Sequence, residues 1–589
     1  MNYPVWYLPS VGGGTLIALI AVTHVFVSHF AVGGGLYLVL TEMKARRENN
    51  PELLGFLRGH VKFFLILTLV FGSLSGVGIW FVIALVQPAG TSLLIHNFVF
   101  GWATEWVFFL VEIIAITIYY YTFDRMDPKT HVSVGWVYFI FAWLSLFIIN
   151  GIITFMLTPG GWTDTGNFWS GFLNPTFWPS LVFRTFIAFS LAGVFAFLTT
   201  AFSRSSAIKK SMTRYAGVWA LAPLVAALPA GWWYFQTLPD EARRMVSATH
   251  PVIQKILNHG GFSFLGLVVL MVVFAFILPR FHNKVVAFVM LALALASMGA
   301  FEWTRENARN PYVVNGGDGV LYSSGIWADS LAEVDGAGFL STARWTAQKD
   351  VHEESLVEAG EDLFRFQCYA CHTIGGLNKD ILPLTDHMDY KTMRSYLDRI
   401  HETRYFMPPF AGTDQEARAL AAFIVQGLHG KNVPPAGESS EASSGEKLFQ
   451  DNCSGCHPVS LVRDRTADWD REKLLDALDR LNEINPAMPD FEWTSAEKEA
   501  LGDYIREEKA ETGVDAGEDV FEDNCAMCHS LRGGENSLLP KIEDWDKERV
   551  RSSLDKLPQL NPAMPPLKVP AEKKEALTDF LVQKSKGDR

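Results

Sequence analysis

Apolar and polar residues are distributed very differently in the two halves of this 589-residue chain. Up to about residue 310, apolar runs of about 20 residues recur between short polar connections, and each is long enough to cross a bilayer as a helix. The eight runs lie near 14–40, 61–86, 98–123, 132–157, 180–202, 215–235, 261–279 and 285–304. Beyond them, apolar residues follow the spacing of short amphipathic helices. The pattern predicts an all-α chain: a polytopic bundle of about eight transmembrane helices, then small helical domains.

The connections between the apolar runs alternate in charge. Those at 42–62, 124–131, 203–214 and 280–284 carry 13 lysines and arginines, whereas the opposite connections carry three. Lysine and arginine accumulate on the cytoplasmic side of a membrane. With an even number of spans, both termini then face outward, on the periplasmic side of a bacterial inner membrane. The length of the first run and its glycines favour a retained helix over a cleaved signal peptide.

The motif Cys-x-x-Cys-His occurs three times in the C-terminal half and contains all six cysteines of the chain. The three copies are Cys368, Cys371 and His372; Cys453, Cys456 and His457; and Cys525, Cys528 and His529. Two cysteines at this spacing can form thioethers to a haem, and the adjacent histidine then lies beneath its iron. A zinc knuckle is the alternative for any one motif, but tetrahedral zinc needs more soft ligands than one motif supplies.

Each motif is followed, 31 to 35 residues after its histidine, by a Met-Pro pair. The three methionines are Met407, Met488 and Met564. Methionine opposite histidine is a common ligand set for cytochrome c iron. The sequence therefore predicts three covalent haem c groups with His/Met ligation. Met388, Met393 and His401 could compete for the first iron, although surface or core roles explain them better.

The three motifs define internal repeats. Each repeat begins with a short amphipathic helix that runs into the motif and ends with a helix after the methionine, so it resembles a class I cytochrome c. The predicted domains are a membrane domain at 1–312, a linker at 313–350, cytochrome c domains at 351–432, 445–512 and 513–589, and a second linker at 433–444. That second linker is rich in Pro, Gly, Ser and Glu.

Charge divides the chain in the same way. Residues 1–310 hold 19 basic and 12 acidic side chains, and the remainder holds 31 and 51. The acidic C-terminal half could steer a basic redox partner of the cytochrome c type, or it could simply keep an extracytoplasmic arm soluble. Nothing in the sequence points to nucleic-acid binding.

Several ionisable residues fall inside the apolar runs, where burial is costly and usually functional. They are His24 and His29 in the first run, Glu105 and Glu112 in the third, Arg184 in the fifth, and Glu302, Arg305, Glu306 and Arg309 at the end of the eighth. Glu105 and Glu112 are seven residues apart and therefore share a helix face. Histidine and carboxylates at this depth suggest haem ligands, a proton path, or both. Buried ion pairs, such as Arg184 with a carboxylate, are the structural alternative.

The first and third runs carry a family resemblance. Thr23-His24, followed nine residues later by Gly33, matches the first helix of subunit I of cytochrome bd quinol oxidases, in which this histidine binds the active-site haem. Glu105 and Glu112, followed by Asp124-Arg125, are similar to that family's pair of third-helix glutamates and terminal Asp-Arg, with a spacing one residue shorter.

The end of the eighth run carries the most specific part of the resemblance. The segment Glu306-Asn-Ala-Arg309-Asn-Pro311-Tyr312 is similar to the Glu-x-Gly-Arg-Gln-Pro-Trp pattern that closes the family's eighth helix. There the glutamate belongs to the high-spin haem b site. The resemblance thus implies two membrane haems, a high-spin haem b and a second haem of b or d type, and further membrane subunits as partners.

The departures from the family concern electron delivery. The family's low-spin haem b is held by a fifth-helix histidine and a seventh-helix methionine, but Arg184 stands at the first position and a leucine near 262–267 at the second. The outward loop that binds quinol is reduced to about 25 residues, 236–260, and the family's ninth helix is missing.

Together these features suggest a cytochrome bd-like terminal reductase of O2, or of NO, fed by c-type haems instead of quinol. In this hypothesis His24 is the axial ligand of the oxygen-site haem and Glu306 the ligand of the high-spin haem. Glu105 is a second carboxylate of the site, Glu112 a proton relay, and Arg309 a propionate or carboxylate partner. The alternative is a non-catalytic electron relay that links periplasmic redox proteins to a membrane complex. The sequence leaves open haem b or d, the acceptor, the direction of flow and the order of the c haems.

Overall fold

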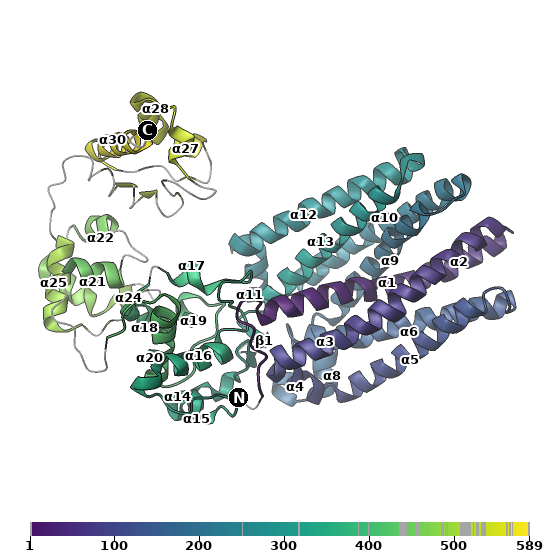
Figure 1. Ribbon diagram of the computed structural model, residues 1–589, viewed down its shortest axis with the longest axis horizontal. Helices are drawn as coiled ribbons and strands as arrows, with labels where there is room; N and C mark the ends of the chain where they lie inside the picture. The colour runs from purple at the N-terminus through teal and green to yellow at the C-terminus, as the bar shows by residue number, and fades with distance from the viewer. Residues whose placement is uncertain are drawn as a thin grey trace. The chain divides into compact units, whose positions relative to one another are not determined.

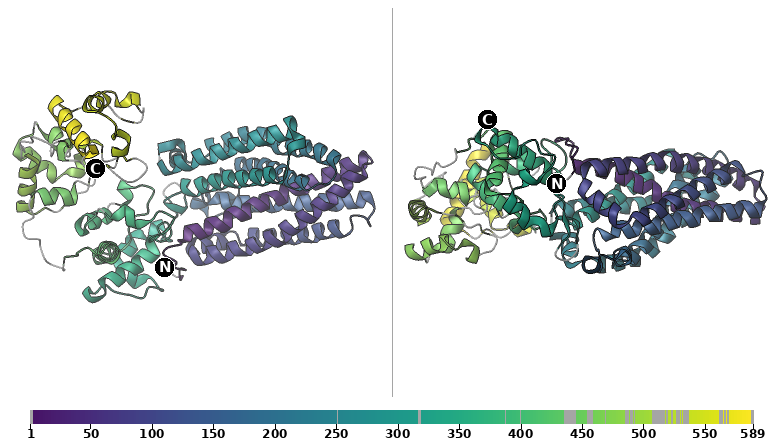
Figure 2. Two further views of the ribbon diagram at one scale, coloured as in Figure 1. Left: turned by 45° about the horizontal axis from the view of Figure 1, so that its top comes forward. Right: turned by 90° about the horizontal axis from the view of Figure 1, so that it is seen from below.

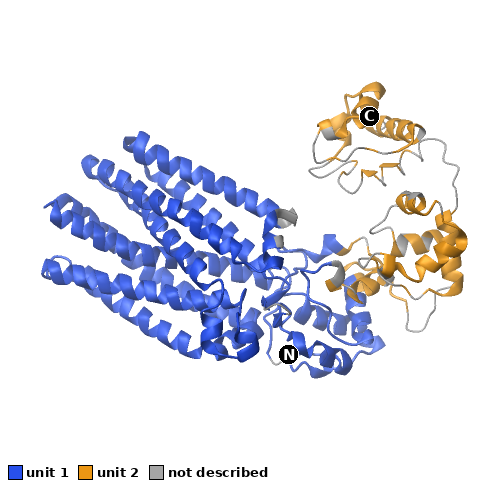
Figure 3. Ribbon diagram, turned by 180° about the vertical axis from the view of Figure 1, so that it is seen from behind, with its two compact units in different colours: residues 1–384, 404–424 blue, residues 385–403, 425–589 orange. Residues whose placement is uncertain are grey.

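The chain is almost entirely helical in the structure, which is a computed structural model. It describes residues 3–249, 251–315, 319–386, 388–398, 400–434, 445–453, 459–467, 469–484, 488, 491, 493–506, 517, 520–521, 524–525, 529, 531, 537–560, 564, 567 and 569–586. Contacts divide the chain into two compact units (Figure 3). The first contains residues 1–384 and 404–424, and the second contains 385–403 and 425–589.

Among the described residues, eight helices are long and apolar enough to cross a membrane, which confirms the predicted number. They run side by side in the first unit (Figures 1 and 2). The spans are α1 (Gly13–Arg47), α2 (Pro51–Leu65) continued by the π-helix η1 (Ile66–Gly72) and α3 (Ser73–Val86), α5 (Val99–Tyr121), α6 (Pro128–Phe155), α9 (Phe177–Ala201), α10 (Ser206–Gln236), α12 (Pro251–Val272) continued by η3 (Val273–Ile277), and α13 (Lys284–Ala308).

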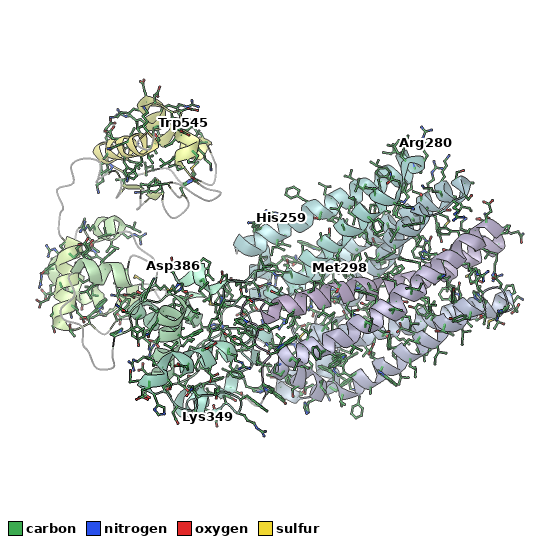
Figure 4. The ribbon with its side chains drawn as sticks, viewed as in Figure 1. His259, Arg280, Met298, Lys349, Asp386 and Trp545 are labelled. Atoms are coloured by element: carbon green, nitrogen blue, oxygen red, sulfur yellow. The ribbon has the colours of Figure 1, made fainter. Side chains whose placement is uncertain are left out.

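Short helices connect the spans. They are α4 (Pro88–Asn97), α7 (Trp162–Thr165), α8 (Phe168–Phe172), α11 (Asp240–Arg244), η2 (Met245–Thr249) and η4 (Pro279–Phe281). In Figure 4, His259 in α12 and Arg280, just beyond that span, mark opposite ends of the bundle. Residues 351–384 and 404–424, the part of the first predicted cytochrome c segment that belongs to the same unit, lie at the His259 end (Figure 4).

Two basic connections are much shorter than predicted. The connection predicted at 42–62 is reduced to residues 48–50, and the one predicted at 124–131 ends at Asp127. The cause is local capping: Asn50 accepts a hydrogen bond from the amide of Leu53, Asp127 accepts one from Thr130, and a proline follows each cap. Such Asx-Pro pairs start helices abruptly. Polar residues assigned to loops therefore lie inside helices.

Helix α1 is the centre of the bundle and contacts α2, α3, α6, α9 and α13. Its approach to α9 depends on Gly33, because a Cβ there would lie 1.9 Å from the carbonyl oxygen of Ala188. Helix α9 is the most enclosed span, with 67% of its apolar window buried. These two helices therefore position whatever the bundle holds at its centre.

Residues 313–350, predicted as a linker, contain short elements that join the bundle to the first cytochrome c segment. They are β1 (Tyr312–Val314) and β2 (Leu321–Tyr322), which pair antiparallel, and then η5 (Ala328–Ser330), α14 (Leu331–Ala337) and α15 (Phe339–Thr342). Asp362 accepts hydrogen bonds from the amides of Ala347 and Gln348, which ties the end of this stretch to the cytochrome segment.

The remaining helices belong to the cytochrome c repeats. They are η6 (Glu353–Ser355), α16 (Leu356–Gln367), α17 (Ile381–Thr385), α18 (Tyr390–Asp398), α19 (Ile400–Thr403), α20 (Asp414–Ala422), η7 (Phe423–Leu428), α21 (Gly445–Asn452), α22 (Val459–Thr466), α23 (Arg471–Leu478), α24 (Leu481–Ile484), α25 (Ser495–Arg506), α27 (Leu539–Ile542), α28 (Lys547–Leu554), α29 (Leu557–Leu560) and α30 (Ala571–Lys586).

The three repeats share one helix crossing. In each, a glycine near the start of the first helix meets a backbone carbonyl of the last helix so closely that a Cβ would lie about 2 Å from it. The pairs are Gly360 with Ala419, Gly445 with Ala500, and Gly517 with Ala576. An aromatic pair follows each crossing: Phe364 with Phe423, Phe449 with Tyr504, and Phe521 with Phe580. The same contact thus recurs three times, as the predicted repeats require.

Candidate functional site

The membrane bundle encloses one large cavity of about 1030 Å³. This is the upper end of the range of roughly 300–1,000 Å³ typical of ligand sites. Its walls come from α1, the η1–α3 region, α5, α6, α9 and α13, and residues 370, 371 and 377–379 of the first cytochrome c segment also line it. The ionisable residues in its lining are His24, His29, Glu105, Glu112, Arg184, Glu302, Arg305, Glu306, Arg309 and Lys379. All five membrane residues predicted for the site therefore line one cavity.

His24 lies on α1, where its ring is held by the second span. Its Nδ1 is 3.0 Å from the hydroxyl of Ser75, and Gly76 packs against the ring so that an added Cβ would lie 3.2 Å from Cε1. The π-helical turn η1 directly precedes these two residues. Such turns occur frequently at functional sites because they shift the register of one helix face.

Glu105 and Glu112 face the same cavity from α5. Glu112 accepts a hydrogen bond of 2.6 Å from the hydroxyl of Ser145 in α6. No described residue donates a hydrogen bond to Glu105, whose carboxylate is partly accessible along the cavity wall. The seven-residue spacing thus places the two carboxylates about two turns apart: that of Glu112 accepts a hydrogen bond, and that of Glu105 accepts none from a described residue.

A charge ladder of five residues of alternating sign begins at Arg184 on α9 and continues along α13 to its end through Glu302, Arg305, Glu306 and Arg309. Arg184 Nη1 lies 3.1 Å from Glu302 Oε1, and both side chains are buried. Arg305 donates to Glu302 at 2.8 Å and to Glu306 at 2.6 Å. The structural alternative for Arg184, a buried pair with a carboxylate, is therefore what the structure contains.

The outer end of the charge ladder fixes the turn into β1. Arg309 donates to Glu306 through Nε at 3.1 Å, and its Nη1 donates to the carbonyl oxygens of Tyr312 and Val313. At the inner end, Arg184 Nη1 lies 3.5 Å from His29 Nε2. Arg184 therefore occupies the space beside the second histidine of α1, and Glu306 is held between two guanidinium groups.

The first cytochrome c motif follows directly from α16. Cys371 and His372 both donate their amides to the carbonyl of Cys368, so the motif forms a single tight turn. The Nδ1 of His372 donates to the carbonyl of Lys379 at 2.9 Å, which fixes the ring and leaves Nε2 for a metal. Burial, with a smaller contribution from Cys371, raises the pKa of the Cys368 thiol to about 12. Neither cysteine forms a disulfide, as thioether formation requires.

The distal side of the first repeat is described as well. The amide of Met407 donates to the carbonyl of Arg404 and so closes the turn that ends at Met407. Met407 lies in the same compact unit as the motif. Met393 is 1% exposed on α18, which supports its assignment as a core residue.

The second and third motifs are described in part. Cys453, Cys525, His529, Met488 and Met564 are described, whereas Cys456, His457 and Cys528 lie outside the described residues. The first cysteine of each motif donates its amide to the phenylalanine of the shared helix crossing: Cys368 to Phe364, Cys453 to Phe449, and Cys525 to Phe521. The three motifs therefore begin at equivalent places in the repeat.

Sequence reasoning missed a second buried polar cluster, formed by Glu42, Tyr119 and His131. Glu42 accepts hydrogen bonds from Tyr119 (2.6 Å), from His131 Nδ1 (2.9 Å) and from Arg46 (2.6 Å). His131 Nε2 donates to the carbonyl of Tyr119 at 2.8 Å. Both ring nitrogens of His131 thus face oxygen acceptors. The Asp127-Pro128 cap was the signal that His131 belongs to a helix.

Comparison with known proteins gives two family matches. Residues 15–255 match the family of cytochrome bd terminal oxidase subunit I. Residues 355–424, 440–505 and 512–581 each match the family of cytochrome C oxidase, cbb3-type, subunit III. The first match ends before α13, so the resemblance of the Glu306–Tyr312 segment lies outside it.

Comparison with solved structures and with curated proteins is less informative than these family matches. The bd oxidase from Geobacillus thermodenitrificans matches 52% of this chain and 89% of its own, with 16% sequence identity and a TM-score of 0.45. The curated proteins give no match.

Proposed function

Because the chain joins a cytochrome bd subunit I segment to three cytochrome c segments, we propose that it is a terminal reductase of O2, or of NO, supplied with electrons by its own c-type haems. The matches to these families and the eight apolar helices support a multi-pass membrane protein of multihaem electron transfer. The observation that carries the finer proposal is the cavity, since it gathers His24, Glu105, Glu112 and Glu306 and extends to Cys371 of the first haem motif.

In this proposal His24 is the axial ligand of a membrane haem. Ser75 engages Nδ1, so Nε2 is the nitrogen directed to iron. A haem iron held there would supply an open coordination position at which O2 or NO is reduced. The size of the cavity and its mixture of imidazole, carboxylate, guanidinium and apolar side chains fit such a group.

The carboxylates supply protons to the same place. Glu112, which accepts a hydrogen bond from the Ser145 hydroxyl, is the proposed proton relay, and Glu105, to which no described residue donates, is proposed to exchange protons with the cavity. Reduction of O2 to water consumes one proton for each electron, so a carboxylate pair on one helix face suits this reaction.

Glu306 fits its proposed role less simply. As a ligand of a second, high-spin haem it would have to release Arg305 or Arg309, which now bind its two oxygens. With both arginines in place, its carboxylate instead holds the guanidinium of Arg309, the proposed propionate or carboxylate partner, at the cavity wall. The second candidate function, a non-catalytic electron relay, does not require Glu306 as a haem ligand, and this observation favours it.

The proposed location is the bacterial inner membrane, with both termini and the cytochrome c segments on the periplasmic side. The support is the charge of the connections, since 13 of the 16 lysines and arginines in them fall on the side of residues 42–62 and 280–284. Further membrane subunits and a redox partner of the cytochrome c type are the proposed partners.

The deciding experiment is a reduced-minus-oxidised and CO-difference spectrum of the purified full chain, with haem types quantified as pyridine haemochromes. The reductase proposal expects three haem c groups and membrane haems of b or d type, one of which binds CO. Membrane haems that do not respond to CO would support the relay. Haem c alone would likewise contradict the reductase and leave the relay.

A further inference from the structure

The N-terminal segment Val5–Gly14, called the strap below, binds the first cytochrome c segment. The amide of Leu8 donates to the hydroxyl of Tyr369 at 3.0 Å, and the amide of Ile374 donates to the carbonyl of Pro9 at 2.8 Å. One bond lies on each side of the Cys371–His372 turn. The strap continues directly into α1, which carries His24, so it connects the haem motif to the cavity wall.

Side chains reinforce this contact. Arg365 donates through Nη2 to the carbonyl of Val5 at 2.9 Å, and its guanidinium lies 5.5 Å from the ring centre of Tyr7. Tyr7 packs edge-on against Tyr369, which is 1% exposed. An arginine that binds a carbonyl and an aromatic ring together forms a specific contact rather than a general electrostatic one.

Glycines allow the two backbones to touch. A Cβ on Gly376 would lie 2.0 Å from the carbonyl oxygen of Ser10, and one on Gly12 would lie 2.5 Å from Thr373 Cγ2. Gly12 also has φ +78°, a conformation that side chains disfavour. The close fit therefore depends on glycine at both positions, against backbone at Gly376 and against the Thr373 side chain at Gly12.

On its far side, the same loop forms part of the cavity wall. Ala370, Cys371 and residues 377–379 line the cavity, and Lys379 Nζ donates to Asn307 Oδ1 on α13 at 3.4 Å. The carbonyl of Lys379 also fixes the ring of His372. One short loop thus contacts both the proximal histidine of the first haem motif and the helix that carries Glu302 and Glu306.

From this arrangement we propose that the first cytochrome c segment is the docked electron donor of the membrane cavity, held in place by the strap. The inference rests on the proposed function and names its immediate donor. One electron passes at each event from the reduced first segment to the oxidised acceptor in the cavity, and no bond is formed or broken. Electrons from the other two segments, or from an external partner, reach the cavity through the first.

The test separates docking from electron delivery by means of Gly376→Ala, whose new Cβ cannot coexist with the Ser10 carbonyl. The matched control is Gly336→Ala in α14, where a Cβ meets nothing within 4 Å. In case Gly376→Ala impairs haem attachment, Arg365→Met is a second variant, and its control is Arg418→Met, whose partner Glu353 belongs to the cytochrome segment itself.

Two measurements are made on the full chain with its haems. Hydrogen exchange of strap amides and of Ile374 reports docking, and we expect it to become roughly tenfold faster or more in Gly376→Ala but unchanged in Gly336→Ala. Time-resolved absorbance after photoreduction of the c haems reports delivery to the membrane haem, and we expect several-fold slower delivery in the strap variants with unaltered haem c spectra.

The outcomes are distinct. Faster exchange together with slower delivery supports the proposal. Unchanged exchange overturns the docking, and faster exchange with unchanged delivery overturns the donor role. If no membrane haem is reduced even in the unaltered chain, the proposed function fails and the donor role fails with it, while the exchange data still decide the docking.

Discussion

The buried pair of Arg184 and Glu302 allows a quantitative test of how the centre of the bundle is held together. The two side chains are 4% and 6% exposed, and their charged atoms are 3.1 Å apart. At an effective dielectric constant of about 20, Coulomb attraction at this distance is about 5 kcal/mol before desolvation is subtracted. Glu302 keeps one partner if Arg184 is lost, because Arg305 donates to its other oxygen.

We therefore expect Arg184→Leu to lower the free energy of unfolding by about 2–4 kcal/mol. Removing one member of a buried ion pair typically costs about 3–5 kcal/mol, and the remaining bond from Arg305 offsets part of this. At about 2–4 °C per kcal/mol for a large domain, the melting temperature should fall by roughly 4–16 °C. The assay is thermal unfolding of the purified full chain in detergent, followed by tryptophan fluorescence.

The double variant Arg184→Leu/Glu302→Gln supplies the internal control. It removes the uncompensated carboxylate and keeps an acceptor for Arg305, so it should regain at least half of the lost stability. Arg58→Leu is the external control, because its pair with Asp124 is exposed and such pairs contribute about 0–1 kcal/mol. If Arg184→Leu melts like Arg58→Leu, or if the double variant loses as much as both single changes added, the buried pair is not what stabilises this region.

Three further predictions concern other parts of the chain. His24→Ala should abolish the signal of the CO-binding membrane haem in difference spectra, while pyridine haemochromes still report haem c. An unchanged CO signal would contradict its role as ligand. Gly33→Ala should lower the melting temperature through its clash with the Ala188 carbonyl, at about 1–3 kcal/mol, whereas Gly55→Ala, with nothing within 4 Å, should not. Burial lowers the pKa of His282, which lies outside the spans, so as the pH falls the unfolded chain binds this proton before the folded chain does. Stability should therefore fall as the pH drops below about 6.5. A melting temperature that changes as little between pH 8 and 5.5 as that of His282→Gln would contradict this.

The number of spans could be predicted because hydrophobic run length depends on local sequence alone. Their ends could not be placed from hydropathy, since Glu42 and His131 are polar yet lie inside helices. Capping by Asp127 begins the helix that contains His131, and capping by Asn50 begins α2 ten residues before its apolar run; both are local signals but not hydropathic ones. The three haem motifs could likewise be predicted from the sequence, because their chemistry requires a fixed spacing.

The pairings within the site could not be predicted in the same way. The ionisable partners of Arg184, His29 and Glu302, lie more than 100 residues away, and several carboxylates at membrane depth were equally eligible. The contacts of the strap could not be predicted from the sequence for a related reason. Its bonds to Tyr369 and Ile374 join residues about 360 positions apart and use mostly backbone groups, which leave no mark in composition or periodicity.

An arginine cannot simply replace a haem-binding histidine at the centre of a bilayer, because a buried cation needs a carboxylate within reach. Glu302 is that carboxylate for Arg184, and its second oxygen accepts a hydrogen bond from Arg305. Arg305 also donates to Glu306, which in turn accepts from Arg309 at the end of α13. The charge ladder is thus a connected consequence of having Arg184 at this position. In the proposed function a bundle altered in this way has lost its route for electrons from quinol and needs another donor. The loop of the first haem motif, which shares the cavity wall with the end of the ladder, lies where such a donor would have to be.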